Sequence, residues 1–248
     1  MKISIITASF NNKKTLQQTI HSVLSQDYDN IEYIIIDGGS TDGTVEMISS
    51  YGNKITTFIS EPDEGIYDAL NKGVRLATGD VVGFMHSDDF FASTTIVSEI
   101  AQTFKNTHVD AVYGDLHYVA EQDPTKTIRN WVSSDFINHK LKRGWMPPHP
   151  TLYIKNECYK KYGLYNTQLR IAADYDLILR YFGTHQITSA YLPKTIVKMR
   201  LGGASNNSIK AIKNKMKEDY WALKHNKIGG IFTLAIKNLS KITQFIKK

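Results

Sequence analysis

Cysteine and long apolar runs are scarce in this sequence, and each absence excludes a class of protein. The 248 residues include one cysteine, Cys158, so an internal disulfide framework and a metal site built from several cysteines are both excluded. No stretch reaches the roughly 20 apolar residues that a membrane-spanning helix needs. The N-terminal MKISIITASF lacks the cleavage site of a signal peptide and reads as a first strand. We therefore expect a cytoplasmic protein.

Two common phosphate-binding motifs are also missing. The first predicted strand is not followed by G-x-G-x-x-G, and G-x-x-x-x-G-K-[ST] occurs nowhere in the chain. A dinucleotide-binding fold and a P-loop are therefore not expected. If the protein binds phosphate groups, their charge has to be neutralised in another way, for example by a metal ion.

Charge is distributed unevenly along the chain. Residues 1–110 hold 7 Lys and Arg against 15 Asp and Glu, whereas residues 111–248 hold 23 against 9, which gives net charges of −8 and +14. A basic half could meet nucleic acid, anionic lipid or a phosphorylated substrate. It contains no recognisable nucleic-acid-binding module, so we expect no nucleic-acid partner.

Short apolar strand patterns alternate with helix patterns in the first half of the chain. This alternation predicts an α/β fold with a parallel sheet covered by helices. Right-handed crossovers then bring the ends of these strands to one rim of the sheet. The predicted strands are Lys2 to Ala8, Ile31 to Ile36, Ile55 to Ile59 and the run that begins at Val81.

Two adjacent carboxylates, Asp88 and Asp89, directly follow the apolar run at Val81. Ligands of parallel sheets bind just beyond the carboxyl ends of the strands. Adjacent carboxylates repel each other unless a cation holds them, and Mg²⁺ or Mn²⁺ binds carboxylate oxygens and substrate phosphates together. The pair predicts either a metal-diphosphate site or a simple turn before the next helix.

Further carboxylates follow the other strands or begin the helices after them. The topology gathers many of them at the rim of Asp88 and Asp89, where they would form a polar site for a nucleotide and a metal. Each also has a structural explanation as a cap, turn or first-turn residue. The set comprises Asp37, Asp42, Asp63 and Asp68.

Five segments in a fixed order carry a resemblance to a known family. They are the first strand with Ser9 to Asn12, IIIDGGSTDGT (34–44), EPDEGIYDALNKG (61–73), ATGDVVGFMHSDD (77–89) and ADYDLILR (173–180). Together they resemble the inverting family 2 glycosyltransferases of the GT-A fold. With the downstream GGAS at 202–205, the chain is similar to bacterial enzymes that assemble O-antigen, capsule or other surface polysaccharides.

The resemblance implies a mostly parallel GT-A sheet, a UDP-sugar donor and Mn²⁺ or Mg²⁺ as cofactor. Thr7, Ser9 and Asp37 match positions that line the nucleoside pocket. Asp88 and Asp89 match the DXD-type motif, with Asp89 the direct metal ligand and Asp88 nearer the ribose and donor sugar. Other donor-site positions are matched by Asp68, Asn71, Lys72 and Arg200.

Asp174 is the predicted catalytic base. It matches the acid of the family's E-D motif, whose first position is Ala173 in this chain. An inverting sugar transfer needs one carboxylate to take the acceptor proton while a metal stabilises the departing diphosphate. Asp176, two positions later, should point to another side of the helix. From the residues alone, Asp174 reads equally well as a helix cap or first-turn acid.

The region between these motifs suggests the acceptor side. A strand over Asp110 to Val119 is predicted to pair antiparallel with Lys126 to Val132. The loop Trp145 to Pro150 is rich in proline. Trp145 either offers a face to an acceptor sugar or is a buried aromatic residue, and His149 could touch the diphosphate or the acceptor, or be structural.

The chain end reads as a basic helical extension. A GT-A domain over 1–205, with a nucleotide-sugar half (1–110) and an acceptor half (111–205), is followed by helices in 206–248. The last stretch places Ile231, Ala235 and Leu239 on one side, with lysines such as Lys237 around it. Such a helix either lies on the anionic inner membrane surface or packs on protein. The protein would then be its own domain or the second subunit of a homodimer.

The sequence thus predicts a metal-dependent transfer of a hexose or N-acetylhexosamine from a UDP-sugar to a polyprenyl-diphosphate-linked saccharide. The protein would be peripheral on the cytoplasmic face of the membrane. The alternatives are a catalytically silent, membrane-associated scaffold that binds nucleotide sugars, or a sugar nucleotidyltransferase. Ser9 to Asn12 lacks the glycine-rich basic loop that a nucleotidyltransferase needs, and intact Asp88, Asp89 and Asp174 argue against the scaffold.

Overall fold

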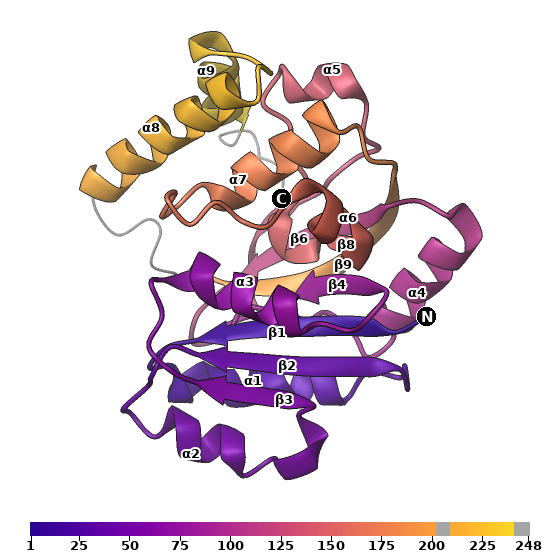
Figure 1. Cartoon of the computed structure of the whole chain (residues 1–248), viewed down its shortest axis with the longest axis vertical. Coiled ribbons are helices and arrows are strands. Elements are labelled where there is room, and N and C mark those ends of the chain that lie inside the picture. The colour runs from indigo at the N-terminus through magenta and orange to yellow at the C-terminus, as the bar shows by residue number, and fades with distance from the viewer. Residues whose placement is uncertain (202–208, 241–248) are drawn as a thin grey trace.

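The computed structural model describes residues 1–201 and 209–240 (Figure 1). The predicted GGAS motif at 202–205 lies outside the described residues. So does the end of the predicted basic helix, with Lys241, Ile242, Ile246, Lys247 and Lys248.

The first half of the chain forms the predicted parallel sheet. Four strands lie in the order β3-β2-β1-β4, and every pairing among them is parallel. The apolar runs become strands because both faces are covered: all seven residues of β1 are buried. The strands are β1 (Ile3–Ser9), β2 (Ile31–Asp37), β3 (Thr57–Ser60) and β4 (Val81–Phe84).

Helices cover this sheet on both faces and create two apolar cores. One face packs against α1 (Lys13–Leu24), α2 (Thr44–Ser49) and α4 (Ile96–Thr107). The other packs against α3 (Ile66–Leu76), α6 (Asn156–Tyr162) and α7 (Ala173–Ile178). Neighbouring strand residues therefore serve opposite cores, so that Ile5 belongs to the first and Ile6 to the second.

The second half extends the sheet with mixed pairings. The order continues from β4 through β8, β6 and β9 to β5, and β7 pairs with β6. The predicted antiparallel pair is confirmed as β6 (Ala111–Val119) with β7 (Thr127–Trp131). The remaining strands are β5 (Phe90–Phe91), β8 (Tyr153–Lys155) and β9 (Ser189–Arg200). β9 lies between β5 and β6, and thus connects the Asp88–Asp89 turn to the acceptor half.

Four short helical segments complete the fold. The 3-10 turn η1 (Gly52–Lys54) joins α2 to β3, while the second half contains α5 (Asn138–Leu141), the 3-10 turn η2 (His149–Thr151) and the π-helical turn η3 (Leu179–Thr184), which directly follows α7. The last described helices, α8 (Ile209–His225) and α9 (Ile231–Ser240), lie together beside α7 (Figure 1).

The C-terminal helices are attached to α7 by polar contacts. Asn226 donates to Asp176 at 2.8 Å, and Lys237 forms a 2.8 Å ion pair with Asp219. Lys237 is only 3% exposed, so the prediction that it lies on the outer basic face of this helix is wrong. A buried lysine is stable here because Asp219 neutralises it.

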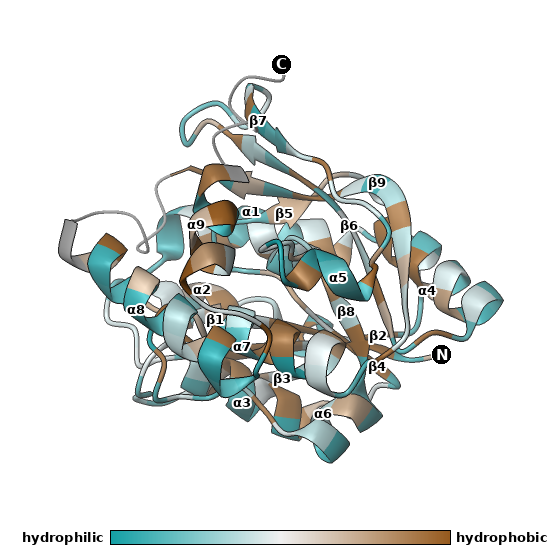
Figure 2. Cartoon of the chain, turned by 90° about the horizontal axis from the view of Figure 1, so that it is seen from above, coloured by the Kyte–Doolittle hydropathy of each residue, from teal (hydrophilic) through white to brown (hydrophobic). Residues whose placement is uncertain are grey.

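The outer side of α9 is apolar. Ile231, Phe232 and Leu239 are 62%, 83% and 62% exposed, whereas Leu234 faces the protein. Much of the α9 ribbon has the brown colour of hydrophobic residues in Figure 2. Within residues 1–201 and 209–240, no helix has both the length and the hydropathy to cross a membrane.

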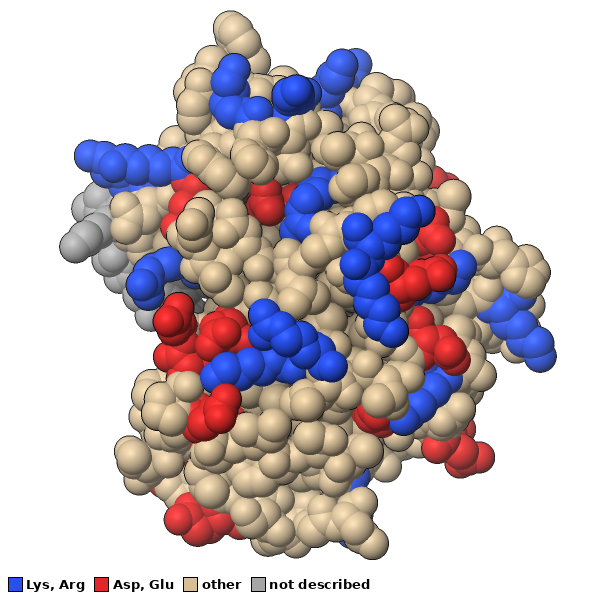
Figure 3. All heavy atoms as spheres, in the orientation of Figure 1, with Lys and Arg blue, Asp and Glu red and all other residues tan. Residues whose placement is uncertain are grey.

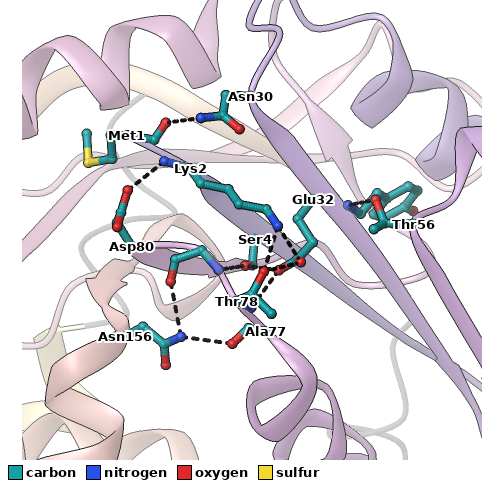
Figure 4. A network of polar contacts seen from close by, with 12 residues as sticks. Met1, Lys2, Ser4, Asn30, Glu32, Thr56, Ala77, Thr78, Asp80 and Asn156 are labelled. Atoms are coloured by element: carbon teal, nitrogen blue, oxygen red, sulfur yellow. Dashed lines mark hydrogen bonds and ion pairs between the residues drawn. The ribbon is translucent and has the colours of Figure 1, made fainter.

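A polar network closes the edge of the sheet opposite the predicted site (Figure 4). Glu32 accepts hydrogen bonds from Lys2 Nζ at 2.7 Å, Ser4 Oγ at 2.6 Å, and the backbone N–H and hydroxyl of Thr78 at 2.7 and 2.6 Å. Next to it, Asn156 donates to two backbone carbonyls that follow α3. These contacts tie β1, β2 and β4 together where each strand begins.

Candidate functional site

A pocket of about 650 Å³ opens at the carboxyl ends of β1, β2 and β3. Its lining combines an aromatic ring, acidic side chains and one cation, as a nucleotide site requires. Gly38 keeps the pocket open, because a Cβ there would lie 2.6 Å from Asp63 Oδ2 and 3.3 Å from the Phe10 ring. The lining residues are Phe10, Gly38, Pro62, Asp63, Glu64, Gly65 and Arg170.

Phe10 and Arg170 were not predicted as site residues. Phe10 is 63% exposed, which is unusual for a large aromatic side chain directly after a buried strand. The position of an aromatic residue directly after the first strand was the sequence signal that could have identified Phe10 as a site residue. Arg170 comes from the other half of the chain, four residues before Asp174, and no sequence pattern connects it with the pocket.

The three predicted nucleoside residues lie below the pocket surface. Thr7 is fully buried and its hydroxyl shares a 3.1 Å hydrogen bond with that of Tyr33, on the α1 side of the sheet. Its predicted place in the nucleoside pocket stays a prediction. Ser9 is buried and its hydroxyl has no hydrogen-bond partner among the described residues.

Asp37 is fully buried at the end of β2. Its carboxylate accepts hydrogen bonds from the backbone of Gly39 and Ser40 at 3.1 and 2.8 Å, and from the hydroxyl of Ser60 at 2.7 Å. In this structure Asp37 shapes the loop beneath the pocket. Its predicted contact with a nucleobase stays a prediction.

Two other loop acids have the structural roles that the sequence left open. Asp42 accepts from the backbone N–H groups of Lys13 and Thr44 at 3.1 and 3.0 Å. Asp63 accepts from Gly65 N–H at 2.8 Å. Both carboxylates thus stabilise turns at the pocket rim.

Asp88 and Asp89 lie in the tight turn between β4 and β5. Asp89 is fully buried; its Oδ1 accepts the backbone N–H of Arg200 at 3.3 Å, and its Oδ2 has no hydrogen-bond partner within residues 1–201 and 209–240. Burial first, and then the neighbouring charge of Asp88, raise the pKa of Asp89 well above its usual value. Burial also raises the pKa of Asp88. A cation beside these groups would reverse both effects.

Arg200 holds this turn from β9. Its guanidinium donates to the carbonyl of Asp88 and to the side chain of Gln18, and it lies over the Phe90 ring. Arg200 is 6% exposed in this structure, and its predicted contact with a donor phosphate stays a prediction. Arg200 fixes the backbone of the acidic pair.

The two carboxylates fit a small divalent cation bound together with a substrate. Among residues 1–201 and 209–240, no cluster of three or more His, Cys, Asp or Glu could enclose a metal. Mg²⁺ and Mn²⁺ are often held by one or two carboxylates, with substrate phosphates and water completing the shell. The unpartnered Oδ2 of buried Asp89 is the ligand atom that such an ion would use.

The predicted donor residues of α3 have different environments. Lys72 pairs with Glu61 at 2.9 Å and Asp68 at 3.5 Å, beside the pocket loop. Asn71 is buried, and its amide bonds to the backbone carbonyl and N–H of Tyr165 at 2.9 and 3.0 Å. Both polar atoms of the Asn71 amide thus hold the chain before α7, and its predicted donor contact stays a prediction.

Asp174 begins the short helix α7 and faces a histidine. Its Oδ2 lies 3.0 Å from Nδ1 of His149, and its Oδ1 accepts from the Tyr67 hydroxyl at 3.3 Å. Burial alone would raise the pKa of Asp174, but the charge and hydrogen bond of His149, helped by Lys237, hold it well below its usual value. Asp174 therefore stays ionised.

Asp176 points elsewhere, as predicted. It is buried, accepts from Asn226 and lies 3.8 Å from Arg180. On the far side of His149 lies His86, from the loop after β4, with ring centres 5.6 Å apart. His149 thus sits between the Asp174 helix and the segment that leads to Asp88.

Trp145 is partly buried in an aromatic cluster. It stacks on Phe136 with ring centres 5.3 Å apart and meets the edge of Tyr113 at 5.8 Å. At least one face of its indole ring is thus occupied by protein. The role of Trp145 in acceptor binding stays a prediction.

Sequence comparisons connect the chain with sugar transfer. The profile of the family described as Glycosyl transferase family 2 matches residues 4–165. An uncharacterized glycosyltransferase of Mycobacterium tuberculosis is 32% identical over 192 residues, which cover 72% of this chain and 68% of that protein. A PGL/p-HBAD biosynthesis glycosyltransferase of Mycobacterium bovis is 26% identical over 211 residues, 83% of this chain and 79% of that protein.

Solved structures share the fold at low sequence identity. S. aureus TarS superposes with a TM-score of 0.70 at 18% identity over 90% of this chain, which spans 40% of the TarS chain. TarS 1-349 in complex with UDP-GlcNAc has a TM-score of 0.68 and 16% sequence identity, and the match covers 91% of this chain and 65% of that one. The mannosyltransferase PcManGT from Pyrobaculum calidifontis, in complex with GDP-Man and Mn2+, has a TM-score of 0.62 and 16% identity, and the match covers 99% of this chain and 81% of that one.

Proposed function

Because this chain belongs to glycosyl transferase family 2, we propose that it is a metal-dependent inverting transferase that moves a hexose or N-acetylhexosamine from a UDP-sugar. The observation that carries this proposal is the Asp88–Asp89 turn, with a buried, unpartnered carboxylate oxygen on Asp89. The GT-A fold, confirmed by the solved structures, and the position of the turn after β4 support this proposal, because ligands of such sheets bind beyond the carboxyl ends of the strands.

The nucleotide would occupy the pocket lined by Phe10 and Arg170. An exposed aromatic ring can stack on a base, and a guanidinium can pair with phosphate or ribose oxygens. TarS binds UDP-GlcNAc, which supports a UDP-linked donor, whereas PcManGT binds GDP-Man. We propose a UDP-linked donor. A GDP-linked donor is the alternative, and the titration described below distinguishes the two.

Transfer needs a stabilised leaving group and a proton acceptor. A divalent metal on Asp89, with Asp88 beside it, would neutralise the departing diphosphate. Asp174 is the carboxylate proposed for removing the acceptor proton, acting either through its own oxygen or through the histidine that it holds. Attack from the face opposite the diphosphate would invert the anomeric centre, so an α-linked donor gives a β-linked product.

We further propose a lipid-linked saccharide as acceptor in bacterial surface polysaccharide biosynthesis. The relative from M. bovis is named for PGL/p-HBAD biosynthesis, and the exposed apolar face of α9 supports work beside a membrane. Lysines and arginines are spread over the same end of the molecule (Figure 3). These features support a peripheral position on an anionic membrane surface.

Calorimetric titration of UDP into the protein tests the donor site. With Mn²⁺ we expect measurable binding, and with EDTA or in Asp89→Asn we expect affinity to fall at least about tenfold, since the metal links protein to diphosphate. Asparagine keeps the size of the side chain, so the fold should persist. Asp29→Ala, an exposed acid before β2, is the matched control and should bind like wild type.

Three outcomes of this titration would contradict parts of the proposal. GDP binding in place of UDP would change the donor. Equal UDP affinity in EDTA and in Asp89→Asn would remove the metal from the site. Absence of binding to either nucleotide would contradict the proposed donor site itself.

A further inference from the structure

We propose that the atom that takes the acceptor proton is Nε2 of His149, and that Asp174 orients this imidazole from behind. The inference rests on the transfer reaction proposed above and deepens it. Its basis is the 3.0 Å contact between His149 Nδ1 and Asp174 Oδ2. This contact uses one ring nitrogen and leaves the other directed away from the carboxylate.

The carboxylate of Asp174 is already engaged on both oxygens. Oδ2 faces His149, while Oδ1 accepts from Tyr67, whose hydroxyl also donates to the carbonyl of Ile171 at 2.8 Å. The Asp174 side chain is 15% exposed against 34% for His149. An arriving hydroxyl group therefore meets the imidazole more readily than the carboxylate.

The turn that carries His149 is held in place. Thr151 donates from its hydroxyl to the carbonyl of Gly114 at 3.0 Å and to that of Pro148 at 2.8 Å. The prolines on either side, Pro148 and Pro150, are buried. Such a turn presents the ring in a fixed direction, as a proton acceptor requires.

The charges around the ring favour this division of roles. His149 is faced by Asp174 from α7 and by His86 from the β4–β5 loop, while Lys237 of α9 acts on Asp174 from behind. Against the effect of burial, the hydrogen bond of His149 and the charge of Lys237 favour the ionised form of Asp174, and an ionised carboxylate is a stable partner for an imidazolium. Asp174 would thus keep the Nδ1–H tautomer and stabilise the charge formed on His149.

The chemical step balances with the groups present. The acceptor O–H bond breaks and its proton passes to Nε2 of His149. The acceptor oxygen forms a bond to the anomeric carbon, and the bond from this carbon to the diphosphate oxygen breaks, with its electron pair leaving on the nucleotide. His149 ends as an imidazolium paired with the Asp174 carboxylate.

Nitrogen-15 NMR of histidine-labelled protein tests the tautomer without turnover. We expect neutral His149, assigned by comparison with His149→Gln, to carry its proton on Nδ1 in wild type and to lose this preference in Asp174→Asn. A wild-type ring that carries its proton on Nε2, or that stays doubly protonated up to pH 9, would overturn the inference, because neither form offers a lone pair at Nε2.

Turnover provides the second test, and the readout is the amount of UDP released. The donors are UDP-GlcNAc, UDP-glucose and UDP-galactose, and the acceptors are octyl glycosides and water. His149→Ala should lose about 10²- to 10⁴-fold in kcat, and added imidazole should restore at least about tenfold. His139→Ala, an exposed histidine on α5, is the matched control. The double variant with Asp174→Asn should be no worse than the poorer single variant.

Two results distinguish a failure of this inference from a failure of the proposed function. If His149→Gln stays within about tenfold of wild type while Asp174→Asn is inactive, Asp174 is the base and the inference is wrong. The pH dependence of kcat separates the two kinds of base. An enzyme with a carboxylate base of lowered pKa keeps its rate down to about pH 4, whereas enzymes with a histidine base lose their rate between about pH 8 and 5. If wild type neither binds UDP nor releases it, the proposed function itself fails.

Discussion

The buried carboxylates of this protein differ in how many hydrogen bonds they accept. This number distinguishes the structural acids from the candidate metal ligand. Glu32 and Asp37 each accept several and are part of the scaffold. Asp89 accepts one, from Arg200, and keeps one buried oxygen without a partner. A buried carboxylate oxygen without a hydrogen-bond partner is costly. This oxygen of Asp89 therefore supports the proposed cation site.

Glu32→Gln should destabilise the protein in a pH-dependent way. Burial opposes ionisation, but the hydrogen bonds from Lys2, Ser4 and Thr78 outweigh it and lower the pKa of Glu32 to about 2. Because the folded pKa lies below the unfolded one, this stability is complete above about pH 4.5 and is lost as the pH falls towards 2. We expect a loss of about 2 to 3 kcal/mol at pH 7 in urea unfolding.

The matched control is Glu121→Gln, since Glu121 is 61% exposed and faces Lys14 at 3.8 Å. This exposed pair should matter little. If the Glu32 variant loses as much stability at pH 3 as at pH 7, the network does not act through the charge of Glu32.

Site residues were predictable from the sequence where a motif determines the backbone, and not where strand direction or a distant partner decides. Asp88 and Asp89 follow a strand and lie at the expected rim. Thr7 is buried and shares a hydrogen bond with Tyr33, which no motif indicates. Asn71 and Arg200 are bound by Tyr165 and Gln18, which are 94 and 182 positions away in the chain.

Among the elements, α7 depends most on its neighbours. It has six residues and no side-chain cap of its own. Glu218 of α8 supplies the acceptors, since its carboxylate takes the backbone N–H groups of Arg170, Ile171 and Ala172 at 3.2, 2.8 and 2.9 Å. The C-terminal helices therefore hold both the pocket wall at Arg170 and the helix of Asp174.

Glu218→Ala should lower both stability and turnover. Three N–H groups lose a charged acceptor, which costs about 1 to 3 kcal/mol in unfolding free energy. We expect kcat to fall more than UDP affinity, because α7 carries Asp174 while most of the pocket lies on other loops. Thermal unfolding and UDP-sugar turnover measure the two effects.

Glu218→Gln, which keeps one acceptor oxygen, should recover part of the loss. Glu157→Ala is the control, because this acid is 74% exposed on α6. Wild-type kcat in Glu218→Ala would show that the cap does not position the helix of Asp174.

The sequence predicted the long elements and missed those that tertiary contacts create. The alternating pattern of the first half predicted four strands in the right places, since β1, β2 and β4 are buried apolar runs. β5 and β8, with two and three residues, are too short for any periodic signal. In α9 the periodicity did not indicate that Lys237 is buried, because its partner Asp219 lies on another helix.

At the scale of the whole molecule, the acidic and basic halves face different partners. Acidic side chains gather where β1 to β3 end, and basic ones are spread around α8 and α9 (Figure 3). A cation and a nucleotide suit the first surface, and an anionic membrane suits the second.

The protein should bind vesicles containing phosphatidylglycerol more strongly than vesicles of phosphatidylcholine alone. Phe232→Glu with Ile236→Glu should weaken co-sedimentation at least about tenfold, because charges replace the apolar face of α9. High salt should weaken it in wild type. Val132→Glu is the control, since Val132 is 67% exposed on another part of the surface.

A second copy of the chain could cover the same face. A stable dimer in analytical ultracentrifugation, broken by the α9 double variant and accompanied by no vesicle binding, would contradict the membrane proposal.

The place of β9 between β5 and β6 also governs the order in which the protein can mature during synthesis. β1 to β4 and the helices α1 to α3 are complete within the first 84 residues and can form while the ribosome is still translating the rest. The Asp88–Asp89 turn is different, because its partners on β9 end at Arg200. A nascent chain would therefore form its first four strands well before this turn is complete, and we expect the proposed donor binding to begin only after β9 has been synthesised.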